Sequence, residues 1–255
     1  AEVFGKREDK FKTLNESDMQ TVVWKKLNYS EPYYFFTPKD FGAGMEYEKG
    51  FKINDLFQLN SVGVVTSRDA FLISDDKNIL ENRLHDILTV DLSNEEFEAK
   101  YNLKTKYFNP DIARSASRES RVAKIIKCFY RPFDIRYILF DLNFLERSRD
   151  KVMKHMISKN NIALVCSKQS TMNDIDNVQV VDSVIELKFN SHDRNSNIFP
   201  LYLYAEDGSK ITNLKKEIIN DIEKIVGKVT PEDIFDYIYA VLYSPSYREK
   251  YKEFL

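Results

Sequence analysis

Short runs of β-branched and aromatic residues predict strands in several parts of the chain. Two such runs lie in the first third, at residues 21–24 and 33–36, and the second is bounded by Pro32 and Pro38. Residues 62–66 form an apolar stretch that is typical of a buried strand. Further strands are predicted at residues 128–140, 161–166, 178–189 and 198–204.

Helical spacing of apolar residues alternates with these runs. Residues 77–100 predict a helix in two pieces, and Ser93 is a suitable N-cap for the second piece because Glu95 and Glu96 follow it. Asn109 and Pro110 predict the start of another helix, which we expect to continue to about residue 126. The remaining predicted helices are a short one at 53–57, an amphipathic one at 147–157, and a helical tail at 213–255 that is interrupted at Ser244 and Pro245.

This order of elements predicts the fold class. Strands and helices are mixed through most of the chain, which favours an α/β (mixed α+β) fold with a central mixed sheet, flanking helices and a C-terminal helical lobe. Residues 206–209 are the best candidate for a boundary. We therefore expect a mixed α/β lobe at 1–206 and a helical lobe at 207–255, or one integrated domain.

Composition narrows the class of protein. The 255 residues are 43% hydrophobic and 31% charged, which excludes wholesale disorder, and the net charge of -2 excludes a globally basic protein. No apolar run approaches the roughly 20 residues that span a bilayer, so no membrane partner is expected. The two cysteines and three histidines are scattered, which predicts reduced cytosolic thiols and no metal site.

The motifs of several enzyme classes are missing or weak. Residues 42–44 contain the only glycine cluster, and we expect a turn there rather than a cofactor loop, because no clear strand precedes it. No phosphate-binding GxxxxGK[ST] motif exists. Asp182, Glu186 and Lys188 resemble the motif of a metal-dependent nuclease, in which an acid is followed by Asp/Glu-x-Lys. Their spacing on a strand would place all three on one face. A nuclease domain therefore stays open as an alternative.

Charge is strongly segregated along the chain. Residues 114–154 contain eleven bases and five acids, whereas residues 69–99 contain nine acids and two bases. Arg114, Arg118 and Arg121 are spaced to share one helical face, which Lys124 would extend. Such a face can grip a polyanion through counterion release, although a solvated face with acidic partners would look the same. We expect the acidic 69–99 region to face away from nucleic acid.

Two other polar segments are candidates for the same partner. Arg147, Arg149, Lys151 and Lys154 gather around the start of a predicted helix, where backbone N–H groups favour anions. A polar loop follows the predicted strand at 161–166, and its Ser167, Lys168, Gln169 and Thr171 can donate hydrogen bonds to base edges. Arg68 is a further candidate for approaching bases. The aromatic run at 33–36 could stack on bases, but it is also typical of a core strand.

Seven segments occur in a familiar order. They are EVFGKREDK at 2–10, GVVTSRD at 63–69, YRPFDIR at 130–136, RDKVMKHM at 149–156, NIALV at 161–165, FPLYLY at 199–204 and YIYAVLYSPSYREKY at 237–251. This series resembles the C-terminal specificity domain of Type ISP restriction-modification enzymes. Residues of such motifs can also be structural: Arg131, Asp134 and Arg136 could form an internal ion pair that braces a strand.

The resemblance implies a function. Family members are single-chain bacterial enzymes with nuclease, helicase-like ATPase, adenine methyltransferase and target-recognition parts. It implies that this piece reads a short asymmetric sequence in double-stranded DNA and directs adenine-N6 methylation and cleavage by its neighbours. It implies S-adenosylmethionine, ATP and magnesium for the longer protein, and no cofactor or catalysis for this piece. The chain starts without Met, and it ends where family members continue, so we expect an excised piece. A module that docks helicase and methyltransferase parts is the third alternative.

Overall fold

The computed structural model describes residues 5–24, 26, 41–167 and 178–251, which form two compact units. The smaller unit comprises residues 1–50 and 249–254, and its described helices are α1 (Arg7–Glu16) and α2 (Phe41–Tyr47). The glycine cluster at 42–44 therefore lies in a helix, not in the expected turn. Residues 21–24 were expected to form a strand, but they form no strand, and Val23 and Trp24 are exposed. Residues 33–36 lie outside the described part of the chain.

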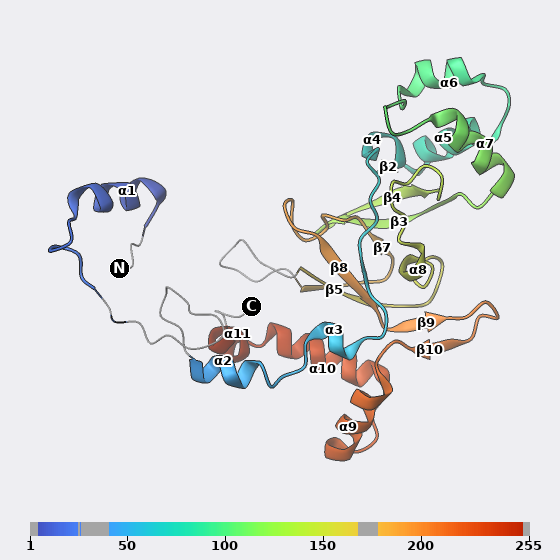
Figure 1. The fold of residues 1–255 in the computed structure, drawn as a ribbon. Coiled ribbons are helices and arrows are strands. Elements are labelled where there is room, and N and C mark those ends of the chain that lie inside the picture. The colour runs from blue at the N-terminus through green and yellow to red at the C-terminus, as the bar shows by residue number, and fades with distance from the viewer. Residues whose placement is uncertain (1–4, 25, 27–40, 168–177, 252–255) are drawn as a thin grey trace. The chain divides into compact units, whose positions relative to one another are not determined.

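The larger unit, residues 51–248, contains two four-stranded sheets and a hairpin (Figure 1). The first sheet has the order β2-β4-β3-β7, with β2 (Ile73–Ser74), β3 (Lys124–Arg131), β4 (Asp134–Phe140) and β7 (Val184–Ile185). The pairs β2–β4 and β3–β4 are antiparallel, while β3 and β7 are parallel. This sheet is mixed, and the mixed α+β class is confirmed.

The second sheet has the order β1-β8-β5-β6 and is antiparallel throughout. Its strands are β1 (Ser61–Val62), β5 (Ala163–Ser167), β6 (Val178–Val181) and β8 (Ser196–Pro200). Gly63 follows β1 where two backbones meet, because a Cβ at this position would lie 2.5 Å from the carbonyl oxygen of Glu186. Only glycine permits that approach.

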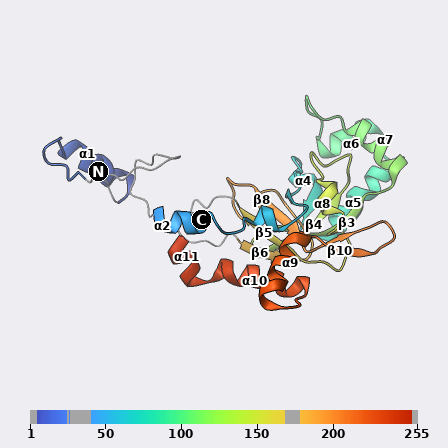
Figure 2. The same ribbon diagram turned by 60° about the horizontal axis from the view of Figure 1, so that its bottom comes forward.

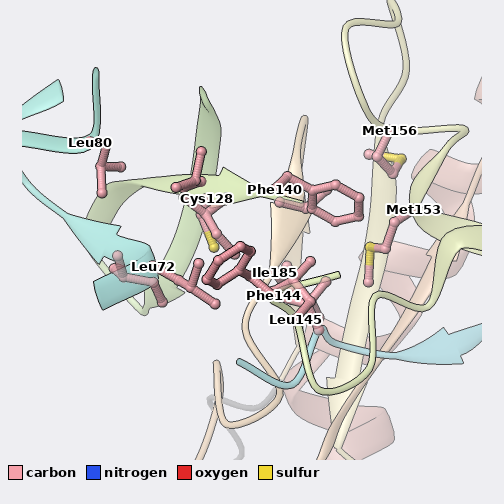
Figure 3. Packing of buried hydrophobic residues seen from close by; sticks show 14 of the residues in the cluster. Leu72, Leu80, Cys128, Phe140, Phe144, Leu145, Met153, Met156 and Ile185 are labelled. Atoms are coloured by element: carbon pink, nitrogen blue, oxygen red, sulfur yellow. The ribbon is translucent and has the colours of Figure 1, made fainter. Parts of the chain in front are cut away.

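Helices cover both sheets. Helix α4 (Asp69–Leu72), α5 (Lys77–Leu88), α6 (Asn94–Tyr101), α7 (Pro110–Ser120) and α8 (Asp150–Met153) pack with the first sheet around a large apolar cluster. Figure 3 shows part of this cluster, in which Phe140, Phe144, Met153 and Met156 gather with Leu72 and Ile185. Helix α3 (Ile53–Leu56), α9 (Lys216–Val226) and α10 (Pro231–Tyr243) share a second cluster with the second sheet.

The predicted boundary at residues 206–209 falls in a hairpin turn. Strands β9 (Tyr202–Tyr204) and β10 (Lys210–Thr212) pair on either side of it. Beyond it, Leu214 and Phe235 share one cluster with Leu164 and Phe199 of the sheet. The helical tail and its interruption are confirmed, since α10 ends at Tyr243 and α11 (Pro245–Tyr251) follows. None of the helices formed by the described residues is long and apolar enough to cross a membrane.

The helical ends of the larger unit lie far apart. Helices α5, α6 and α7 group at one end, while α9 and α10 lie at the other (Figures 1 and 2). Arg114 and Arg118 lie in α7 and Lys124 lies in β3, so these predicted cations are on the first sheet and its helices, away from α9 and α10.

Candidate nucleic-acid interface

Arg114 is the first of the predicted cations, and it is buried rather than exposed. Its relative exposure is 0%, and its guanidinium lies 4.3 Å from the centroid of the Phe97 ring. It donates to four oxygens between the last turn of α5 and the start of α6, from Asp86 (2.9 Å), Leu92 (3.0 Å), Ser93 (3.2 Å) and Asn94 (2.7 Å). Burial lowers the pKa of Arg114. The expected solvent-facing arginine row is corrected here, because this side of α7 packs against α5 and α6.

The rest of that row is also rearranged. Arg118 donates to the carbonyl oxygens of Ile87 and Thr89. Helix α7 ends at Ser120, and Arg121 caps it in the left-handed conformation with φ 47°. The prediction of a helix reaching residue 126 is therefore wrong, and Lys124 begins β3 instead of extending a helical face. Arg121 and Lys124 are both exposed.

Three cations of the β3–β4 hairpin are paired with acids. Lys127 contacts Asp182 at 2.7 Å, and Arg136 contacts Asp134 at 2.7 Å. Arg131 contacts Glu186 at 2.6 Å, and the guanidiniums of Arg131 and Arg136 lie 4.1 Å and 4.3 Å from the ring centroid of Tyr130. The internal pair of Asp134 with Arg136 is confirmed, whereas Arg131 uses Glu186. These cations brace the sheet.

The same pairs bear on the nuclease alternative. Asp182 and Glu186 pair separately with Lys127 and Arg131, and Glu186 also accepts a hydrogen bond from the backbone N–H of Lys188 at 2.7 Å. Within the part of the chain that the structure describes, no three His, Cys, Asp or Glu side chains gather to hold a metal ion.

The segment at residues 147–154, which we call the basic spur, is held at both ends. Arg147 exchanges two backbone hydrogen bonds of 3.0 Å with Val65. At the other end, Val152 and Met153 of α8 are buried in the first cluster, and Figure 3 shows Met153 there. Helix α8 has only four residues, not the expected eleven, so its dipole is small. The spur depends instead on the charges of its side chains.

Cations project from this anchored backbone. Arg147, Lys151 and Lys154 are exposed, and no ion pair engages them among the described residues. Arg149 has φ 56°, and its Nε is buried without a hydrogen-bond partner in the described chain. Arg114 and Arg248 each have a buried guanidinium nitrogen in the same state, so this feature alone does not indicate a ligand. The spur therefore carries the most available positive charge of the sequence-predicted residues.

His155 follows the spur and fixes it to the β9–β10 hairpin. The imidazole is buried, and its Nδ1 accepts a hydrogen bond from the backbone N–H of Tyr204 at 2.9 Å. Burial, with a smaller contribution from Lys154, lowers the pKa of His155, so the ring is neutral at neutral pH. His155 anchors the spur and adds no charge.

Arg68 also faces inward. Its side chain is 10% exposed, and it donates to the carbonyl oxygens of Thr66 (3.0 Å) and Phe144 (2.8 Å) and contacts Glu146 at 3.5 Å. Burial lowers the pKa of Arg68. The structure assigns it to bracing, and its predicted approach to base edges has no geometric support.

The polar loop after β5 is only partly described. Ser167 is the last residue of β5; it is buried and pairs with Ser196 of β8. Lys168, Gln169 and Thr171 lie outside the described residues, so their contact with bases stays a prediction.

The sequence patterns did not predict a basic and aromatic hollow that the structure contains. An open hollow of about 510 Å³ lies beside α7, and Lys104, Lys106 and Tyr107 line it. The signal was present in the sequence as Lys-Thr-Lys-Tyr between two predicted helices, but it lies outside the basic segment at 114–154.

The fold and the sequence together define a specificity domain. The chain belongs to the family described as the Type ISP C-terminal specificity domain, which matches residues 55–255. No curated protein matches the chain.

Three solved structures resemble it. The cryoEM structure of a DrdV–DNA complex has a TM-score of 0.62 at 21% identity, covering 98% of this chain and 27% of that one. A nuclease-deletion mutant of the Type ISP restriction-modification enzyme LlaGI, in complex with a DNA substrate mimic, has a TM-score of 0.61 at 18% identity. The match covers 96% of this chain and 24% of that one. The ATP-dependent Type ISP restriction-modification enzyme LlaBIII bound to DNA has a TM-score of 0.54 at 18% identity. The match covers 78% of this chain and 14% of that one. The chain thus spans about a quarter of the length of the first two, and the likeness is one of fold.

Proposed function

We propose that this domain recognises a specific sequence in double-stranded DNA for a longer restriction-modification polypeptide. The observation that carries the proposal is the family match over residues 55–255, together with solved relatives that are bound to DNA. The domain itself is not catalytic in this proposal. It positions the duplex so that neighbouring methyltransferase and nuclease parts methylate adenine at N6 or cleave an unmethylated site.

The basic spur supports this proposal from the geometry. Arg147, Lys151 and Lys154 are available to phosphates, and an anchored backbone reduces the entropy lost on binding. Gln169 and its neighbours remain our candidates for base contacts.

Cofactors belong to the longer polypeptide in this proposal. S-adenosylmethionine, ATP and magnesium would be held by its methyltransferase, helicase and nuclease parts. The domain needs only DNA and the neighbouring parts of its own chain as partners.

Methylation sequencing tests the proposal directly. Cells that carry the longer polypeptide should show adenine methylation at one short asymmetric motif, and exchanging this domain for that of a relative should change the motif. A duplex with the motif should then bind the isolated chain more tightly than a scrambled duplex. An unchanged motif after the exchange would overturn the proposal.

The exposed apolar residues of the C-terminal helices favour a second role. Ile225 and Val226 of α9 are 85% and 64% exposed, and Tyr237 of α10 is 71% exposed. These side chains are suited to docking the methyltransferase or helicase part. Replacing Ile225 and Val226 with Ser should then lower co-purification of the domain with those parts without changing duplex affinity.

A further inference from the structure

The hollow beside α7 has a rigid frame. Residues Thr105 and Phe108 form a β-bridge, in which the Thr105 N–H donates to the Phe108 carbonyl oxygen at 3.0 Å. The Tyr107 N–H donates to Oγ1 of Thr105 at 3.2 Å. The Phe108 ring points into the domain, 5.7 Å from the Phe144 ring and 3.5 Å from the guanidinium of Arg68. The turn is therefore fixed, and its tip faces solvent.

The tip presents an aromatic ring and cations. Tyr107 is 87% exposed, and the Nζ of Lys106 lies 5.4 Å from the centroid of its ring. Lys104 is exposed as well, and its backbone N–H donates to Glu98 at 2.9 Å. Neither lysine side chain has an acidic partner among the described residues.

The lining of the hollow is free of carboxylates in the described chain. Beside the two lysines and Tyr107 it contains amides and apolar groups, including Asn143 and Ile112. The acidic residues Asp111 and Glu119 line a neighbouring hollow on the same helix, which shares Ile112 and Ala116 with the first. The carboxylate of Glu98 is also close, but it accepts from the backbone N–H of Lys104. Two ammonium groups without an acidic partner in the described chain and an exposed ring form a set suited to an anionic ligand with a planar group.

We propose that this hollow binds an unpaired nucleotide of the DNA, with Lys104 and Lys106 on phosphates and the Tyr107 ring against the base. The inference rests on the proposed function. It extends that function because an adenine must leave the duplex to be methylated, which leaves an unpaired base opposite. Asn143 lines the hollow and stands four residues before Arg147, so the hollow is connected along the chain to the basic spur.

Two DNA probes test the inference with the whole 255-residue chain. One is a fully paired duplex, and the other is the same duplex with one unpaired nucleotide. Fluorescence anisotropy gives the affinity for each, at several salt concentrations. Tyr107→Ala should weaken binding of the second probe by roughly 5- to 150-fold, the range of base–aromatic stacking, and weaken the first probe less. Tyr107→Phe should retain most of the affinity because it keeps the ring.

Substitution of the two lysines should change the affinity for both probes and its salt dependence. The double variant Lys104→Ala and Lys106→Ala should weaken both probes and reduce the salt slope by about 2. Tyr237→Ala and Lys216→Ala, two exposed positions at the opposite end of the unit, are matched controls and should bind like the wild type (Figures 1 and 2).

The outcomes separate the two proposals. If Tyr107→Ala binds both probes like the wild type while substitutions in the basic spur weaken them, the hollow is not a nucleotide site and the proposed function survives. Equal losses on both probes would overturn the preference for an unpaired base. Failure of the wild-type chain to bind either probe at low salt would overturn the proposed function and the inference together.

Discussion

The guanidinium of Arg68 lies 3.5 Å from the centroid of the Phe108 ring. The contact joins two segments about 40 residues apart in sequence, and Arg68 adds hydrogen bonds to Thr66 and Phe144. Arg68→Ala should therefore lower the free energy of unfolding by about 2–4 kcal/mol. Arg68→Lys should lose most of the same amount, because a lysine cannot reproduce the planar fork. Urea denaturation measures both, and a neutral Arg68→Ala would contradict the bracing role.

Arg114 offers a sharper contrast within one helix. Arg114→Ala removes a buried cation that satisfies four oxygens, so we expect a loss of about 3–5 kcal/mol in unfolding free energy. Arg121→Ala, at the exposed end of the same helix, should change it by no more than about 0.5 kcal/mol. Similar losses for the two variants would show that the burial of Arg114 is not what matters.

Phe133 is strained and unpacked. It has φ 63° at the tip of the β3–β4 hairpin and is 99% exposed. The left-handed conformation costs an ordinary residue about 1–2 kcal/mol, while glycine adopts it freely but loses more entropy on folding. Phe133→Gly should therefore stabilise the domain by about 0.5–1 kcal/mol, and Phe133→Ala, which keeps a Cβ, should not. Thermal melting of the three proteins checks this, and a lower melting temperature for Phe133→Gly would contradict it.

Tyr202 predicts an alkaline transition. Its hydroxyl donates to Glu232 at 2.5 Å, which joins β9 to α10. Burial and this acidic neighbour raise the pKa of Tyr202 to about 12, against 10.0 for the unperturbed group. The stability that this bond contributes is complete below pH 10 and is lost as the pH rises towards 12, because only the unfolded chain ionises readily in that window. Urea midpoints of Tyr202→Phe should decline less than those of the wild type over that range; parallel curves would exclude the effect.

The basic spur should govern salt-dependent DNA affinity. Replacing Arg147, Lys151 and Lys154 with Ala should weaken binding to every duplex by about tenfold or more at low salt and reduce the salt slope by about 3. Replacing Lys215, Lys216 and Lys228 removes the same charge near α9 and is the matched control. If both triple variants lose affinity equally, net charge rather than the spur determines binding.

Local signals in the sequence located the starts of α6 and α7 correctly. Ser93 forms the expected cap, with its hydroxyl accepting from the Glu96 N–H and Glu96 accepting from the Ser93 N–H. Asn109 accepts from the Asp111 N–H, and Pro110 is the first helical residue, as predicted. These contacts span three residues or fewer, so the residues themselves contain the information.

The orientation of α7 could not be predicted in the same way. Spacing places Arg114 and Arg118 on one face, but their oxygen partners lie about 20 to 30 residues away, between the last turn of α5 and the start of α6. The inward side of α7 also carries Ala113 and Ser117, whereas Ile112 is 69% exposed. The small side chains of Ala113 and Ser117 beside Arg114 were the only signal in α7 that this face packs closely against another element.

The turn between β9 and β10 has a practical consequence. Residues 205–210 are exposed, Gly208 has φ 84°, and nothing lies within 4 Å of the place where its side chain would begin. Insertions are best tolerated at such tips. A short peptide tag or a genetically encoded fluorophore grafted there would report on the domain inside the full-length polypeptide while leaving both apolar clusters intact.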